Sequence, residues 1–213
     1  YKYNMMDQIR IEDYNYNLPD ERIAKYPLSE RDASKLLKYS DGNVSEYKFH
    51  EIPSILPSGA LMVFNDTKVV PARLHFQRQT GAHIEIFCLE PVDPAEYATM
   101  FAVCDKCTWK CIVGNVKRWK DDLLDLYNPD CEESLCRLQL KARLVERQGE
   151  TSLVEFSWNE GYPFSKVLEM AGSVPIPPYL NRESEDIDLT RYQTVYSKFE
   201  GSVAAPTAGL HFT

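Results

Sequence analysis

The sequence predicts a mixed α and β fold, α+β in class, in which an antiparallel β-barrel-like domain is inserted into a larger α/β domain. Both ends of the chain mix helix-like and strand-like segments, whereas the stretch between them consists of short alternating strands separated by turn signals. With 213 residues, 44% of them hydrophobic, the chain is large enough to bury a core. We therefore expect the main domain at residues 1–72 and 161–213, and the insertion at residues 73–160.

The first part of the main domain is predicted to begin with a short helix and a hairpin. The stretch "NLPDERIAKYP", residues 17–27, places one proline in the first turn of a helix and another at its end. The stretch "KLLKYSDGNVSEYKF", residues 35–49, contains Asp41 and Gly42, which favour the tight turn of a β-hairpin.

The next two segments are predicted to be a helix and a buried strand. Residues 50–59, "HEIPSILPSG", predict a short helix that Pro57 and Gly59 close. Residues 60–64, "ALMVF", form a continuous apolar run, which is typical of a strand buried on both faces.

The remaining elements follow the same reasoning. A helix is expected over residues 163–172, with Pro163 at its start and Gly172 as its C-cap, and another over residues 188–198 after a proline-rich stretch. The strands expected in the insertion are residues 72–78, 83–90, 99–104, 138–146 and 151–158.

Charge and hydropathy limit the classes of function. A net charge of −8 argues against broad, non-specific binding to nucleic acid, although it leaves room for a local basic patch. No apolar run has the length of a membrane span, and the first residues lack the basic and apolar regions of a signal peptide. We therefore expect a cytoplasmic protein that does not interact with membranes.

Three of the six cysteines lie close together in "CDKCTWKC". Cys104, Cys107 and Cys111 have the spacing from which tetrahedral zinc sites often start. The alternative is that Cys104 and Cys111, which sit in strand-like apolar runs, act as small buried hydrophobic residues. The sequence leaves both interpretations open.

Three further segments combine reactive side chains with residues that stiffen the backbone. In "VFNDTKVVPAR", Asn65, Asp66 and Thr67 follow the predicted strand and Arg73 follows a proline. An Asx turn is the structural alternative for the first of these groups. The other two segments are "VPIPPYLNR" and the last 23 residues, and their candidate site residues are Tyr179, Arg182, Arg191, Tyr192, Gln193, Tyr196, Thr207 and His211.

These segments resemble a known family in their order and spacing. The stretches "LPDERIAKYP", "RDASKLL", "LMVFNDTKVVPARL", "VPIPPYLNR" and "RYQTVYSKFEGSVAAPTAGLHFT" are similar to those of the S-adenosylmethionine:tRNA ribosyltransferase-isomerases of queuosine biosynthesis. The resemblance covers nearly the whole chain and is weakest over residues 77–157. Members of the family continue past the motif that contains Thr213, so we expect this chain to be the first part of a longer protein and to be inactive alone.

The resemblance implies an unusual transfer reaction. The family moves the ribosyl part of S-adenosylmethionine to 7-aminomethyl-7-deazaguanine at the wobble position of tRNA and isomerises it, which gives epoxyqueuosine and releases adenine and methionine. No cofactor is expected beyond S-adenosylmethionine as co-substrate, because the sulfonium itself acidifies the neighbouring C5′ and then leaves. We expect a monomer whose tasks are positioning, proton transfer and exclusion of water.

Roles for individual residues follow as hypotheses. As catalytic residues we expect His211, the best titratable group near neutrality, Asp66, which could balance the sulfonium charge, and Tyr192. The aromatic face of Tyr179 or Tyr192 could contact the sulfonium. The predicted substrate-binding residues are Asn65, Thr67, Arg73, Tyr179, Arg182, Gln193 and Thr207.

A basic loop is the candidate contact for tRNA. Lys117, Arg118 and Lys120 surround Trp119, on which a base or sugar could stack. The alternative is a solvated strand edge that the lysines protect.

Two other functions compete with this reading of the sequence. A methyltransferase would need a glycine-rich turn after its first strand, which the sequence lacks. The alternative is a degenerate, non-catalytic tRNA-binding homologue.

Overall fold

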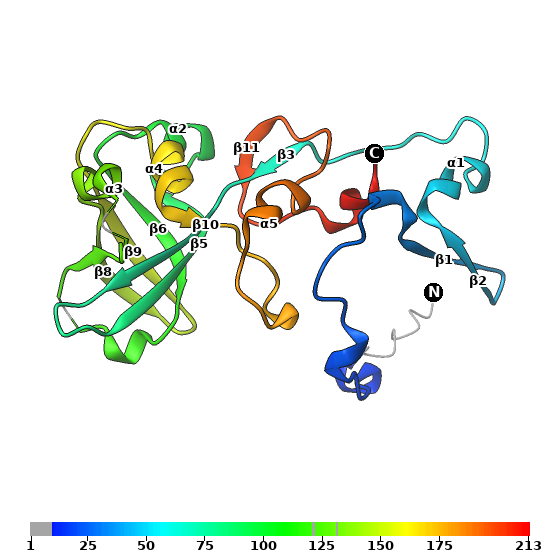
Figure 1. Ribbon diagram of the computed structural model, residues 1–213, viewed down its shortest axis with the longest axis horizontal. Coiled ribbons are helices and arrows are strands. Elements are labelled where there is room, and N and C mark those ends of the chain that lie inside the picture. The colour runs from blue at the N-terminus through cyan, green and yellow to red at the C-terminus, as the bar shows by residue number, and fades with distance from the viewer. Residues whose placement is uncertain (1–9, 121, 131) are drawn as a thin grey trace, which may run out of the picture.

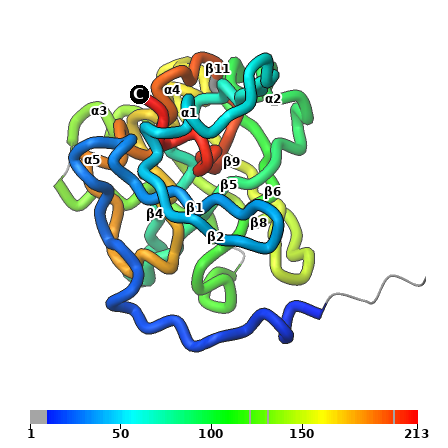
Figure 2. Tube along the Cα trace, turned by 90° about the vertical axis from the view of Figure 1, so that its right-hand side faces the viewer, coloured from blue at the N-terminus to red at the C-terminus, as the bar shows by residue number. Residues whose placement is uncertain are grey.

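The computed structural model describes residues 10–120, 122–130 and 132–213. Figure 1 shows an elongated molecule with a β-barrel at one end and a looser group of helices, loops and short strands at the other. Seen along its length in Figure 2, the first described residues run below the rest of the molecule. The prediction of a mixed fold with a β-barrel is therefore confirmed, while the division into an inserted and a main domain stays a prediction.

Six antiparallel strands close the barrel in the order β4-β5-β6-β9-β8-β7, and β4 pairs with β7 to complete it. A two-residue strand, β10, pairs with Arg73 and Leu74 at the start of β4, on the edge away from β5. The bounds of these strands are Arg73–Gln77 (β4), His83–Asp93 (β5), Lys106–Val113 (β6), Leu124–Leu126 (β7), Lys141–Gln148 (β8), Thr151–Ser157 (β9) and Gly172–Ser173 (β10).

The core of the molecule lies inside this barrel. Inward-facing residues alternate with outward-facing ones along the strands, as in β9, where every second side chain is buried. Three helices are associated with the barrel: α2 (Tyr97–Ala102), α3 (Glu133–Leu138) and α4 (Phe164–Ala171). Phe164 of α4 is fully buried and its ring lies 5.8 Å from Trp109 and 5.7 Å from Phe156.

The other end of the molecule is built from short elements. A hairpin joins β1 (Lys35–Ser40) to β2 (Asn43–Lys48), and β3 (Thr67–Val69) pairs in parallel with β11 (Phe199–Ser202). Two helices, α1 (Ile52–Ile55) and α5 (Asp186–Arg191), lie in this part. Single 3-10 turns are Ile11–Tyr14 (η1), Asp20–Arg22 (η2), Arg31–Ala33 (η3), Phe49–Glu51 (η4) and Pro178–Leu180 (η6), with η5 (Val116–Arg118) in the barrel and η7 (Thr207–His211) near the end of the chain.

Several predicted elements are confirmed. Asp41 and Gly42 both have positive φ, of 51° and 83°, as the predicted hairpin turn requires. Helix α4 begins after Pro163 and ends at Gly172 as expected. At Gly172 any Cβ would overlap the carbonyl oxygen of Pro71, so the close approach of the two segments requires glycine.

The predicted buried strand over residues 60–64 is wrong. Leu61 and Val63 are 90% and 88% exposed, and this segment pairs with no strand among the described residues. Pairing begins three residues later, in β3, where the parallel partner β11 is available. An apolar run indicates a tendency toward burial, but a strand also needs a neighbouring backbone.

Two predictions about secondary structure type or length fail for local reasons. Residues 99–104 were expected to be a strand, but most of them belong to helix α2, whose first turn is capped by the carboxylate of Glu96. The helix expected over residues 188–198 ends at Arg191, with Tyr192 as its C-cap, and the side chain of the following Gln193 bonds to the backbone of β3.

Two other predictions hold only in part. Of the helix expected over residues 17–27, only the single turn η2 forms, and none of the residues in this segment is fully buried. The strand expected from residue 138 begins only at Lys141, because helix α3 extends to Leu138.

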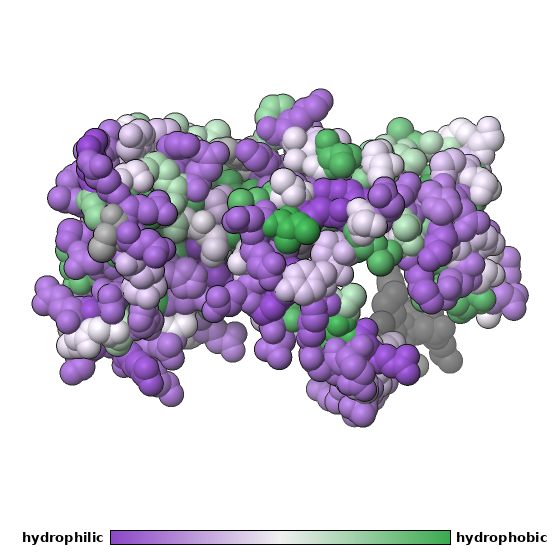
Figure 3. All heavy atoms as spheres, in the orientation of Figure 1, coloured by the Kyte–Doolittle hydropathy of each residue, from purple (hydrophilic) through white to green (hydrophobic). Residues whose placement is uncertain are grey.

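Surface character differs between the two ends. In Figure 3 the barrel side is mainly hydrophilic, whereas apolar residues reach the surface as separate patches in the middle and on the opposite side. None of the helices formed by the described residues has the length and apolar character needed to span a bilayer.

Candidate functional site

Three hollows share lining residues at the end of the described chain. The first, of about 600 Å³, is lined by both Tyr192 and His211. The second, of about 460 Å³, is lined by Asp66 and Phe212, and the third, of about 340 Å³, by His211, Phe212 and Thr213. His211 and Tyr192 therefore line one hollow, and Asp66 lines another that shares Phe212 and Thr213 with the third.

His211 is held in this position by aromatic packing. Its ring lies 5.3 Å from that of Phe49, and the Phe212 ring meets Phe49 edge to face at 4.9 Å. Among the described residues, no side chain or backbone group makes a hydrogen bond to the His211 imidazole. The half-buried imidazole is thus positioned by packing against the neighbouring aromatic rings.

The glycine of the final motif leaves room for the side chain of Tyr196. Gly209 is buried in turn η7, and a Cβ at this position would overlap the Tyr196 hydroxyl. The turn is also tied down by Arg31, whose guanidinium donates to the carbonyl oxygens of Leu210 (3.1 Å), Gln193 (2.7 Å) and Thr190 (2.6 Å). The small residues of "APTAGLHF" therefore serve close packing around the hollows.

Asn65, Asp66 and Thr67 form a turn that leads into β3. The Asn65 Oδ1 accepts hydrogen bonds from the Thr67 backbone N–H at 2.9 Å and from the Thr67 hydroxyl at 2.7 Å. The carbonyl oxygen of Asp66 accepts from the Lys198 N–H at 2.7 Å, where β3 and β11 meet. Asn65 and Thr67 thus bond to one another in an Asx turn, and Asp66 is left facing the second hollow.

Gln193 and Arg182 are engaged within the chain. The Gln193 side chain accepts from the Val69 N–H at 2.9 Å and donates to the Val69 carbonyl at 2.6 Å. Arg182 donates through both terminal nitrogens to Asp188, at 2.7 and 2.8 Å. The guanidinium of Arg182, a predicted substrate-binding group, is therefore already paired with a carboxylate of the protein.

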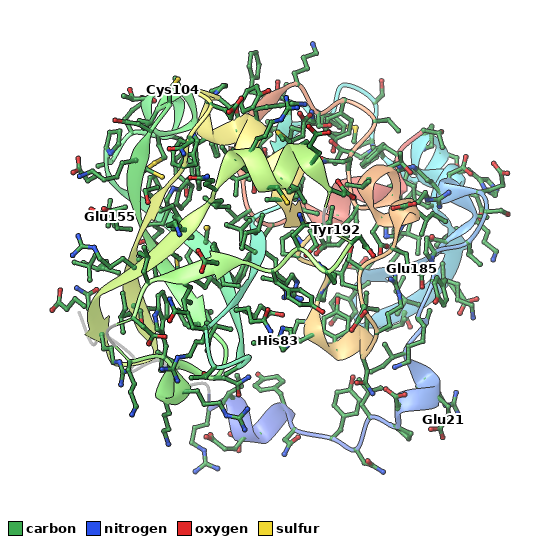
Figure 4. The ribbon with its side chains drawn as sticks, turned by 60° about the vertical axis from the view of Figure 1, so that its left-hand side comes forward. Glu21, His83, Cys104, Glu155, Glu185 and Tyr192 are labelled. Carbon is green, nitrogen blue, oxygen red and sulfur yellow. The ribbon has the colours of Figure 1, made fainter. Side chains whose placement is uncertain are left out.

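Arg182 also binds the early segment of the chain. Its guanidinium donates to the carbonyl of Lys25 and lies 4.6 Å from the ring of Tyr26, whose hydroxyl donates to Glu185. The hydrogen bond from Arg182 lowers the pKa of Asp188, and the bond to Glu185 raises the pKa of Tyr26. Figure 4 shows Glu185 and Tyr192 on the same side of the molecule, away from Cys104 and Glu155.

The other predicted substrate contacts lie outside the hollows. Arg73, at the start of β4, lies over the ring of Phe87 at 5.7 Å and 3.6 Å from the carboxylate of Glu85. Tyr179 is 60% exposed and Thr207 is exposed as well.

Tyr192, which lines the first hollow, is half-buried, and this burial raises the pKa of its hydroxyl.

The basic loop keeps its charges at the surface but not its aromatic ring. Lys117, Arg118 and Lys120 are exposed. Trp119 is fully buried, and its indole N–H donates to the carbonyl of Asp122 at 2.9 Å. The expected stacking of a base on Trp119 is therefore wrong, because the side chain belongs to the barrel core. A role of the three cations in binding tRNA stays a prediction.

The three cysteines of "CDKCTWKC" do not gather into one cluster. Cys104 is exposed in a loop, against the expectation of burial, while Cys107 and Cys111 face the barrel interior from β6. Cys111 lies opposite Cys88 of β5, and burial raises the pKa of the thiols of Cys88 and Cys107. In the ranges that the structure describes, no group of three or more metal-ligating side chains is found.

Several lining residues escaped the sequence reasoning. Phe64 and Lys198 were assigned to a buried strand and a helix, and Phe212 lies in a stretch where only its neighbours were given roles. Arg31 lies in "RDASKLL", a quoted motif to which no functional role was given. Its place in a recognisable motif was the signal from which a role for Arg31 could have been predicted.

Comparison with known proteins identifies the family. Residues 11–213 match the family described as queuosine biosynthesis protein, and the chain therefore belongs to it. Curated relatives named S-adenosylmethionine:tRNA ribosyltransferase-isomerase are 41% identical over 207 residues in Trichlorobacter lovleyi and 36% identical over 208 residues in Aquifex aeolicus. These alignments cover 95% and 96% of this chain but only 54% and 55% of the relatives, so the chain spans about half their length.

Proposed function

We propose that the protein containing this chain transfers the ribosyl part of S-adenosylmethionine to 7-aminomethyl-7-deazaguanine at the wobble position of tRNA. The sugar is isomerised in the same reaction, which gives epoxyqueuosine, adenine and methionine, and S-adenosylmethionine is the only co-substrate. The observation that carries this proposal is that His211 lines the same hollow as Tyr192, while its chain neighbour Phe212 lines the hollow that contains Asp66. The names of the curated relatives support the same reaction.

The residues divide the work of this reaction. The sulfonium acidifies C5′ of the bound sugar, and His211 removes the C5′ proton or protonates the departing adenine. Asp66 offers a negative charge to the sulfonium. The aromatic rings around His211 limit the access of water to the reacting atoms.

Release of adenine and methionine by the intact gene product tests the proposal. Release should depend on tRNA that carries the aminomethyl-deazaguanine, and His211→Ala should slow it by about 10²–10⁴-fold, the usual contribution of a general acid or base. His83→Ala is the matched control, since His83 lies on β5 of the barrel and contacts Tyr127.

Two results would count against the proposal. Turnover of His211→Ala within a few-fold of the unaltered protein would exclude the acid or base role. Binding of the modified tRNA without any release of adenine would identify a non-catalytic homologue instead.

A further inference from the structure

The second hollow is an aromatic enclosure that also carries one acidic and one basic side chain. Three rings from distant parts of the sequence meet there nearly edge to face: Phe64 lies 5.1 Å from Tyr196 and 5.0 Å from Phe212, and Tyr196 lies 6.3 Å from Phe212. Asp66 and Lys198 line the same hollow. The first hollow also has aromatic, acidic and basic lining residues, but its Arg182 and Asp188 are bonded to one another.

These rings differ from the aromatic residues of the barrel in their exposure. Trp109 and Phe164 are completely buried by their neighbours, whereas Phe64 is 44% exposed and Tyr196 and Phe212 are only half-buried. Ring surface is therefore left facing the hollow. The face of an aromatic ring carries partial negative charge and attracts a cation placed over it.

The two charged side chains are available to a ligand. Neither the carboxylate of Asp66 nor the ammonium of Lys198 makes a hydrogen bond or ion pair with another residue in the part of the chain that the structure describes. Their backbones are fixed by the hydrogen bond from the Lys198 N–H to the Asp66 carbonyl, at 2.7 Å. The hollow thus presents one negative charge, one positive charge and several ring faces from a rigid frame.

We infer that this hollow binds the methionine end of S-adenosylmethionine. The sulfonium lies against the rings of Phe64, Tyr196 and Phe212 and is balanced by Asp66, while Lys198 binds the carboxylate of the methionine part. The inference rests on the proposed function, because it assigns a position to that reaction's co-substrate. It also places the sulfonium against Phe212, the chain neighbour of His211.

The test compares S-adenosylmethionine with S-adenosylhomocysteine, which lacks the methyl group and the positive charge. Binding of both to the intact gene product is measured by calorimetry. Phe64→Leu and Tyr196→Leu keep apolar volume but remove the ring face. They should lower the affinity for S-adenosylmethionine by roughly three- to thirtyfold and change the affinity for S-adenosylhomocysteine by less than about twofold. Asp66→Asn should show the same selectivity, whereas Lys198→Gln should weaken both ligands alike.

Phe199→Leu is the matched control. Phe199 follows Lys198 directly but its side chain is 67% exposed and does not line the hollow, so both affinities should stay unchanged. Equal weakening of the two ligands by the ring variants, or no weakening, would overturn the inference even if adenine release is normal. Failure of the unaltered protein both to bind S-adenosylmethionine and to release adenine would overturn the proposed function together with it.

Discussion

The barrel strands hold one another through backbone hydrogen bonds, whereas the segments around the hollows are held together largely by side chains. In the barrel each strand has two neighbours and the ring of strands closes on itself. Around the hollows, Arg31 and Arg191 bind five backbone carbonyls of segments that lie far from them in the sequence. A few charged side chains thus position the candidate site, and single substitutions there should have local effects.

The largest loss of stability is expected for a truncation in the barrel core. Phe164→Ala should lower the free energy of unfolding by about 3–5 kcal/mol, because it leaves a cavity against Trp109 and Phe156. Phe199→Ala, at a 67% exposed position, should change it by no more than about 0.5 kcal/mol. Urea denaturation of both variants measures this, and equal changes would contradict the contrast between the two parts.

The buried ion pair beside the first hollow should have the next largest effect. Asp188→Asn removes the charged partner of Arg182 and should cost about 2–3 kcal/mol at neutral pH. Because the hydrogen bond from Arg182 holds the pKa of Asp188 below its ordinary value of 3.8, this contribution is present above that pH and is lost as the pH falls through the lowered pKa.

Denaturation at several pH values checks this prediction. The difference between the unaltered protein and Asp188→Asn should be full at pH 7 and shrink below pH 3.8. Asp186→Asn on the exposed start of α5 is the control. A difference that does not depend on pH would show that the charge of Asp188 is not the cause.

A smaller and local effect is expected when the arginine that ties down η7 is replaced. Arg31→Lys keeps the charge but cannot reach three carbonyls at once, so the final segment should become easier to open by about 1–2 kcal/mol. Hydrogen exchange should accelerate at Gly209 and Phe212, whose amides bond within η7, but not at Val154 in the barrel. Arg22→Lys should leave all three unchanged, and uniform acceleration would argue against a local role.

The smallest change concerns the basic loop of the barrel. Replacing Lys117, Arg118 and Lys120 by Gln should reduce the salt dependence of tRNA binding, by roughly 0.7–0.9 in log–log slope for each tRNA phosphate that the variant no longer neutralises. Lys141→Gln is the control, because that ammonium already lies 2.6 Å from Asp125. If the slope stays the same in the triple variant, these three side chains do not contact tRNA phosphates and are only solvated.

The sequence by itself determined those features that depend on neighbours along the chain. The Asp41-Gly42 turn, the limits of α4 and the alternation of β9 follow from local backbone preferences and the period of the side chains. The motifs likewise indicated His211 in the final segment and Asp66 after residues 60–64, and each of these residues lines a hollow.

Tertiary structure decided which neighbours each segment meets. The run at residues 60–64 has the composition of a buried strand but lies exposed, and Trp119 looked like a surface ring but fills the barrel. The aromatic enclosure joins Phe64, Tyr196 and Phe212 across almost 150 positions of sequence. Composition sets how strongly a side chain avoids water, but only the path of the chain determines what is there to cover it.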